Sequence, residues 1–129
     1  MSVTEGAASV PAEGTGIAAY LGTEVGGKWW KADRAPGFFV RGRGRYWFDG
    51  GELRFHRDLT KELTRIPLAR VRDVAFGTWH AGKWLAGKPI VKVLWDREQT
   101  ALSSGFGFGD RPTAEAFAAT IRERMQPSA

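Results

Sequence analysis

Apolar and polar residues alternate most clearly between residues 38 and 57. The even positions of 38–48 are apolar or glycine, and the odd positions of 41–47 hold three arginines and a tryptophan, so each set shares one face of a strand. Asp-Gly-Gly at 49–51 favours a tight turn, and 52–57 alternates again with Leu53 and Phe55 on one face. We therefore predict a β-hairpin made of one long, bent strand, a turn and a second strand.

Several further segments have the length and composition of strands. We predict strands over 90–95 and 101–108, at least one strand in 66–68 and 71–76, and an ordered segment of undetermined type over 17–21. In 101–108 the even positions carry Leu, Ser and Phe, whereas the odd positions carry only Ala, Ser and Gly. Glycines interrupt residues 77–89, which we interpret as a loop or a loosely paired hairpin tip.

The period changes to that of a helix near the C-terminus. Five apolar residues recur there at helical spacing: Ala114, Phe117, Ala118, Ile121 and Met125. Asp110 and Thr113 are candidate N-cap residues for this helix. Successive strands followed by one helix predict a mainly β fold, in which a curved antiparallel sheet or small barrel is capped by the helix. Residues 1–15 show no periodicity and are predicted to be a flexible tail, which leaves 16–129 as a single domain.

The composition gives the chain a net positive charge and excludes disulfides and thiol catalysis. The 129 residues carry 19 basic and 14 acidic side chains, a net charge of +5, and the first basic residue is Lys28. The excess therefore falls on residues 28–129 and favours anionic partners. The chain has no cysteine and only two histidines, which excludes disulfides and thiol catalysis. We predict no metal site and no cofactor.

The distribution of apolar residues also bears on location. No stretch approaches the 18 consecutive apolar residues typical of a transmembrane helix, and the positive start of a secretory signal is missing. We expect a cytoplasmic protein, with peripheral association with the inner face of the membrane as an alternative. The excess of arginine over lysine and the abundant alanine and glycine are typical of a GC-rich bacterial genome.

Three stretches and the terminal helix resemble the pleckstrin-homology-like (PH-like) superfamily, including its bacterial and GRAM-type members. The stretches are Arg43–Phe55, Arg65–Val74 and Ile90–Trp95, and with the helix they span about residues 28–126. Residues 77–83, with the strand after them, are more similar to small actinobacterial members without an assigned role. The resemblance implies a PH-like fold and a binding or adaptor role rather than catalysis. Phe117 stands where eukaryotic members favour tryptophan, which weakens any transfer of their functions.

The first candidate site is a basic strand face. Arg41, Arg43 and Arg45 lie about 6–7 Å apart on one face, where planar guanidinium groups could clamp phosphates. In phosphoinositide-binding relatives a lysine, a spacer and Arg-x-Arg hold the lipid headgroup, and Lys31, Arg43 and Arg45 are similar to that pattern. The alternative interpretation is a solvated face whose glycines and charges discourage edge pairing.

The second candidate site is an aromatic and basic loop. Its residues are Trp79, His80, Lys83, Trp84 and Lys88, and within it Ala-Gly-Lys occurs twice, five residues apart. Such loops suit a protein hot spot, insertion at the headgroup level of a membrane, or stacking on nucleic acid. The alternative interpretation is that at least one of the two tryptophans folds back to cover the sheet.

Catalytic constellations are not found in the sequence. His56 falls on an outward strand face, and His80 has no predicted carboxylate to orient it. We therefore predict a non-catalytic binding module that recognises a protein partner through its sheet edge or the loop of the second site. The alternative is peripheral binding of anionic lipid headgroups, nucleic-acid binding ranks third, and an enzyme comes last. Neither the partner nor the oligomeric state follows from the sequence.

Overall fold

The computed structural model describes residues 15–33, 41–61 and 63–125. Except for Thr15, the tail predicted over 1–15 lies outside the described residues, as does the start of the strand predicted over 38–48. The elements follow one another as β1 (Gly16–Val25), β2 (Lys28–Ala32), β3 (Gly42–Asp49), β4 (Glu52–Arg57), β5 (Leu63–Pro67), η1 (Leu68–Arg70), β6 (Val71–Gly77), β7 (Trp79–His80), β8 (Lys83–Trp84), β9 (Ile90–Arg97), β10 (Thr100–Gly107) and α2 (Arg111–Met125).

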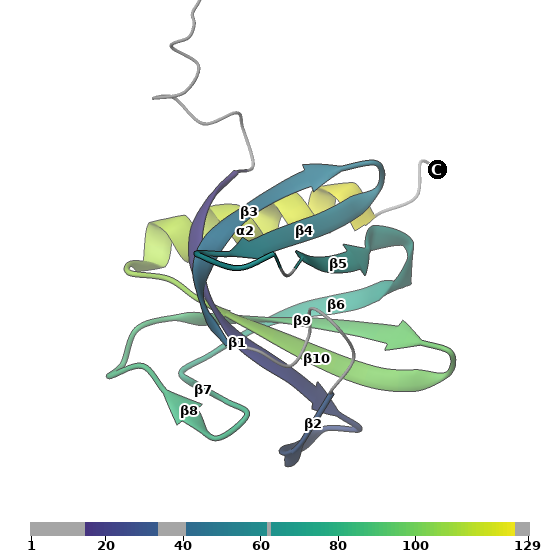
Figure 1. The fold of residues 1–129 in the computed structure, drawn as a ribbon, viewed down its shortest axis with the longest axis horizontal. Coiled ribbons are helices and arrows are strands. Elements are labelled where there is room, and N and C mark those ends of the chain that lie inside the picture. Colours follow the sequence, from purple (N-terminus) through teal and green to yellow (C-terminus); the bar gives the residue numbers. More distant parts are fainter. Residues whose placement is uncertain (1–14, 34–40, 62, 126–129) are drawn as a thin grey trace, which may run out of the picture.

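Eight strands form one bent antiparallel sheet with a helix packed against it, and β7 and β8 form a separate two-stranded sheet (Figure 1). Seven strands follow the order β5-β4-β3-β1-β10-β9-β6, and β2 pairs with β1 beside them. Within the described residues β5 and β6 do not pair with each other, so the sheet stays open and does not close into a barrel. The prediction of a mainly β fold capped by a C-terminal helix is confirmed, in its curved-sheet form.

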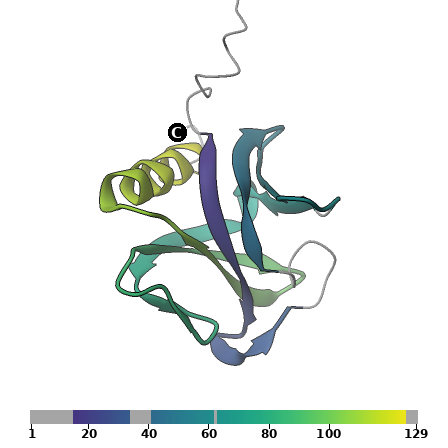
Figure 2. The ribbon, with the colours of Figure 1, turned by 60° about the vertical axis from the view of Figure 1, so that its left-hand side comes forward.

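The strand β1 lies at the centre of the sheet and bends it. It pairs with β3 through residues 16–20 and with β10 through residues 19–25, so both of its edges are occupied. Its pairing with β10 is interrupted between Tyr20 and Thr23, where Gly22 adopts a φ of 89° that favours glycine. Figure 2 shows the resulting bend, with β1 running between the helix and the β3–β4 hairpin.

The hairpin predicted around residues 49–51 is confirmed. The strands β3 and β4 pair in register, with Tyr46 opposite Phe55, and both turn glycines have positive φ. Tyr46, Leu53 and Phe55 are buried, as their alternation predicted.

The helix α2 closes the core on the inner face of the sheet. The Phe117 ring lies 4.7 Å from the Tyr46 ring and 5.3 Å from the Phe106 ring, measured between centroids. Arg122 donates a hydrogen bond of 2.9 Å to the carbonyl of Val74 on the edge strand β6, so the helix contacts β6 as well as β3. Of the two candidate N-caps, Asp110 fills the role, because its carboxylate accepts a 2.8 Å hydrogen bond from the Thr113 N–H.

From Leu102 to Gly107 the strand β10 is buried on both faces. Leu102, Ser104 and Phe106 face the core, where the Ser104 hydroxyl accepts a 3.0 Å hydrogen bond from the indole N–H of Trp95. On the opposite face, the chain between β6 and β9 folds over Gly105 and Gly107. The missing side chains of these glycines provide the space, because a Cβ on Gly105 would lie 2.6 Å from Cγ of His80 and one on Gly107 would overlap Leu85.

Candidate binding site

The segment that covers β10, residues 78–89, is called here the β7–β8 loop. Trp79 pairs with Trp84 and His80 with Lys83 in a two-stranded antiparallel ladder. Ala81 and Gly82 at its tip have φ values of 51° and 81°, and Ala86 and Gly87 have 53° and 84°. Paired positive φ angles are typical of a type I′ turn. The repeated Ala-Gly-Lys therefore marks two successive turns, and the prediction of a loosely paired hairpin tip is confirmed.

Two side chains hold the tip of the β7–β8 loop by hydrogen bonds to the N–H and the carbonyl of Ala81. The Ala81 N–H donates a 2.6 Å hydrogen bond to the Glu24 carboxylate, and Arg41 donates a 2.8 Å hydrogen bond to the Ala81 carbonyl. The Arg41 side chain reaches this carbonyl across Gly22, where a Cβ would meet it at 3.4 Å. Arg41, an exposed residue, therefore stabilises the loop through this hydrogen bond.

His80 anchors the β7–β8 loop from beneath and is completely buried. Its Nε2 lies 3.2 Å from the Gly22 carbonyl, and its Nδ1 lies 3.7 Å from a Glu24 carboxylate oxygen. The expectation that His80 has no carboxylate beside it is therefore wrong. Because the ring is covered, His80 contacts neither a partner nor a substrate, although the sequence placed it among the interaction residues.

Burial makes His80 a source of pH dependence. Removal of the ring from water lowers the pKa of His80 below its ordinary value, and the nearby Glu24 carboxylate opposes this without cancelling it. The folded protein therefore holds a neutral His80 at pH values where the unfolded chain, with a histidine pKa of about 6.5, already binds a proton. The stability that the neutral ring confers is fully present above about pH 6.5, and it decreases as the pH drops below that value.

We expect the urea concentration at the midpoint of unfolding to decrease as the pH is lowered from 7.5 to 5.5. Most carboxylates titrate only below this range. The measurement is a series of urea titrations followed by fluorescence at fixed ionic strength. A His56→Gln variant should retain this dependence, whereas His80→Gln should be less stable at neutral pH and lose most of it. An equal pH dependence in wild type and His80→Gln would contradict the assignment.

A groove lies between the β7–β8 loop and the outer face of the sheet. It has a volume of about 580 Å³ and is lined by residues 17–19 of β1, Arg43 of β3, residues 83–86 and 88 of the loop, and residues 107–109. Most of this lining is apolar, but Arg43, Lys83 and Lys88 contribute three cations. Of the described residues that line the groove, none is acidic. The structure therefore brings one arginine of the first candidate site together with both lysines of the second.

The other basic candidates lie outside the groove. Arg45 is exposed on the same strand as Arg43 but does not line the groove. Lys31 is exposed on β2, which pairs with the Glu24–Val25 end of β1, whereas the groove borders the Ile17–Ala19 end. The lysine and Arg-x-Arg cluster that the resemblance implied is therefore not assembled at the groove.

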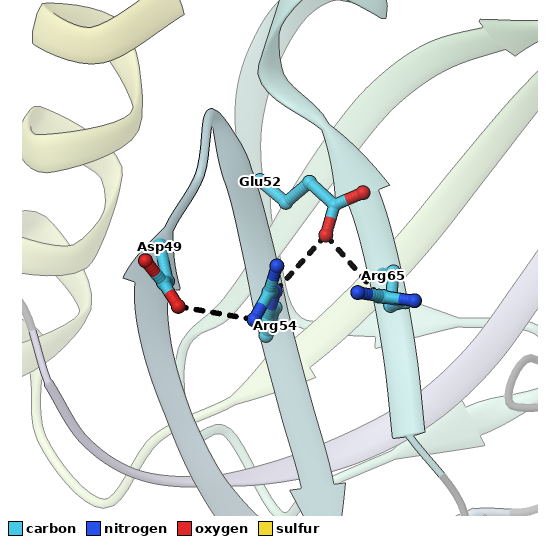
Figure 3. Close-up of polar contacts among 4 residues, drawn as sticks. All are labelled: Asp49, Glu52, Arg54 and Arg65. Carbon is cyan, nitrogen blue, oxygen red and sulfur yellow. Dashed lines mark hydrogen bonds and ion pairs between the residues drawn. The ribbon is translucent and has the colours of Figure 1, made fainter.

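Many of the remaining cations are balanced by carboxylates on the surface. On the β3–β4–β5 face, Glu52 accepts hydrogen bonds from Arg54 and Arg65 at 2.9 and 3.2 Å, and Arg54 also reaches Asp49 at 3.1 Å (Figure 3). Arg97 forms a bidentate pair with the buried Asp33, at 2.7 and 2.9 Å. These arginines therefore each have a carboxylate partner close by.

The charges around the groove are less completely balanced. Arg43 lies 3.9 Å from Asp58, and Lys88 is close enough to Asp110 to lower the pKa of that carboxyl slightly, after the larger effect of the Thr113 hydrogen bonds. Lys83 and Lys88 form no ion pair with the described carboxylates. The groove therefore keeps a net positive rim.

The two tryptophans of the β7–β8 loop stay on the surface. Trp79 is 42% exposed and Trp84 is 61% exposed, and they occupy opposite positions of the two-stranded ladder. The side chains that cover the sheet at Gly105 and Gly107 are those of His80 and Leu85. The alternative interpretation of this loop had assigned that position to a tryptophan. Trp84 also borders the groove, whereas Trp79 does not.

Comparisons with known proteins give no assignment. No known protein family matches the chain, and no curated protein has a significantly similar sequence. Over the described ranges, no three side chains of the His, Cys, Asp and Glu types gather closely enough to hold a metal ion. In the same part of the chain, no helix combines the length and the apolar character needed to cross a membrane.

Proposed function

We propose that this protein is a non-catalytic PH-like binding module that recognises a protein partner through the exposed face of the β7–β8 loop. The observation that carries the proposal is the pair Trp79 and Trp84, both exposed on a loop that buried contacts hold in place. As part of the same proposal, the module works in a bacterial cytoplasm.

The two tryptophans are carried on a loop that is already ordered. Tryptophan is enriched among the few interface residues that dominate binding energy, and each ring can bury about 150–250 Å². A loop that is already ordered loses less conformational entropy when it binds. Because His80, Glu24 and Arg41 fix the loop before any partner arrives, two aromatic anchors are presented at low entropic cost.

The sheet and its helix support the PH-like part of the proposal. An antiparallel sheet that ends in a C-terminal helix, with the helix packed on the inner face, agrees with the arrangement that the resemblance implied. The site chemistry also favours binding over catalysis, because both histidines are engaged: His80 is buried, and Nε2 of His56 lies 2.6 Å from the Thr60 carbonyl.

The proposal is tested with tryptophan variants. A partner is first identified by crosslinking the full chain in lysate of its host, and its Kd is then measured with purified components. We expect Trp79→Ala and Trp84→Ala each to weaken binding at least 30-fold, since a hot-spot truncation costs about 2 kcal/mol or more. The matched control is Trp30→Ala, which removes an exposed tryptophan on β2. Partners bound equally well by all three variants would exclude the loop as the recognition surface.

A second candidate function is reversible binding to an anionic membrane surface. It is favoured by the combination of Lys83, Lys88 and Trp84 on one loop, since cations near such a surface contribute about 1 kcal/mol each and tryptophan suits the headgroup level. Vesicles of anionic lipid therefore serve as one arm of the experiment that follows.

A further inference from the structure

The groove beside the β7–β8 loop combines an apolar interior with a positively charged rim. We propose that it binds a single fatty acyl chain that ends in a carboxylate, at a site that shares only Trp84 with the tryptophan surface proposed for the protein partner. Trp79 belongs to that surface alone, whereas the groove is lined by residues of β1, β3, the β7–β8 loop and the stretch 107–109.

The apolar part of the groove matches a hydrocarbon chain. Its floor includes residues of β1 and β10, where Ala19 and Gly107 are directly paired, and Leu85 of the β7–β8 loop packs over Gly107. Leu85 and Phe108 also line it, and Ile17 is 53% exposed beside them. A volume of about 580 Å³ falls within the range of small-molecule sites, about 300–1,000 Å³.

The charged part of the groove matches one anionic group. Arg43, Lys83 and Lys88 come from two different parts of the chain and meet at the same groove. Arg43 is partly balanced by Asp58 at 3.9 Å, and the Asp110 carboxylate is already bound by the Thr113 N–H. The excess positive charge that remains is small, which suits a single carboxylate better than a polyphosphate.

The backbone around the groove argues against an extended peptide as its occupant. Peptides that add to a sheet bind through unpaired strand edges. Here Ala19 pairs with Gly107 on one side and with Arg43 on the other, so β1 offers no free edge along the groove. An acyl chain needs no hydrogen bonds along its length and is held by apolar contact, with its charge at the rim.

The test is calorimetric titration of the full chain with straight-chain carboxylates of eight to fourteen carbons, each kept below its micelle concentration. We expect binding to strengthen by up to about fourfold for each added methylene, or about 0.8 kcal/mol, until the groove is filled. An alcohol of the same length should bind at least tenfold more weakly. Affinity that is independent of chain length, or equal for alcohol and carboxylate, would overturn the proposal.

Charge variants locate the site. We expect the double variant Lys83→Glu and Lys88→Glu to weaken carboxylate binding at least tenfold, whereas Lys28→Glu with Lys61→Glu makes the same change in net charge outside the groove and should leave it unchanged. A thermal melt of each variant confirms that it is folded. Equal weakening in both double variants would reduce the effect to overall charge and refute the site.

Two further measurements distinguish the acyl site from membrane association and from the partner surface. Binding to anionic vesicles without binding to monomeric carboxylates would reject the acyl site and support membrane association instead. Trp79→Ala should leave carboxylate binding intact, because Trp79 lies outside the groove. The partner proposal and the acyl site can therefore fail independently. If Trp79→Ala abolished carboxylate binding in a folded protein, the assignment of the groove would be wrong.

Discussion

Removal of residues 111–129 is expected to abolish cooperative unfolding of this protein. The deletion takes away α2 and exposes the part of the inner face of the sheet that the helix covers. Phe117 and Ile121, both almost completely buried, contribute about 1.5–3 kcal/mol each, and the Tyr46, Phe106 and Phe108 rings lose their contacts with Phe117. A loss of this size is comparable with the whole stability of a small domain, about 5–15 kcal/mol.

The measurement is a thermal melt followed by near-ultraviolet circular dichroism and calorimetry. A chain that ends at Met125 is the matched control and should keep a sharp transition. Phe117→Ala gives a graded version of the same test, with an expected loss of about 3–5 kcal/mol, while Glu115→Ala on the exposed side of the helix should cost little. A cooperative melt that survives the deletion would mean that the sheet is stable without its helix.

Gly105→Ala is expected to detach the β7–β8 loop from the sheet. The new Cβ would lie 2.6 Å from Cγ of the buried His80 ring, closer than such atoms approach. Because Gly105 is paired with Lys92 in the centre of the sheet, the strand cannot move away, and the ring must leave its place. We expect a stability loss of about 1–3 kcal/mol, as for other overpacked sites, together with weaker binding by the loop.

Limited proteolysis with trypsin measures whether the loop is released, since Lys83 lies on it and is followed by Trp84, whereas Lys88 precedes Pro89 and is not cleaved. Cleavage there should become faster in Gly105→Ala. The matched control is Gly109→Ala, because a Cβ at Gly109 meets nothing within 4 Å. Unchanged cleavage and unchanged stability in Gly105→Ala would show that His80 has room to move without releasing the loop.

The sequence was sufficient for those elements whose own periodicity decides which face they bury. The β3–β4 hairpin and α2 were both predicted, since alternation at period two and apolar spacing at about 3.6 are local properties. The sequence does not determine the conformation of β1, because its Gly-Ile-Ala-Ala-Tyr start has little alternation of polarity. Its strand conformation depends on pairing with β3 and β10 on both sides, which only the folded chain supplies.

The contacts that build the candidate site are not local, and most of them could not be predicted. Glu24 and His80 are 56 positions apart, and nothing in either segment indicates the other. One signal was present in β10, where Gly105 and Gly107 alternate with large residues, because glycines on one face of a strand allow another segment to approach closely. Period two placed Arg41, Arg43 and Arg45 correctly on one face, but the β7–β8 loop then engaged Arg41 and left Arg43 at the groove.

The way the β7–β8 loop is attached divides its residues by the constraint that the fold places on them. His80, Ala81 and Leu85 face the sheet, whereas Lys83, Trp84, Ala86 and Lys88 are exposed. Substitutions at the outward positions leave the anchors intact, much as antibody loops vary on a constant sandwich. The same framework could therefore acquire new binding specificities through substitutions at these four positions. It also offers a small, cysteine-free scaffold for selecting designed binders.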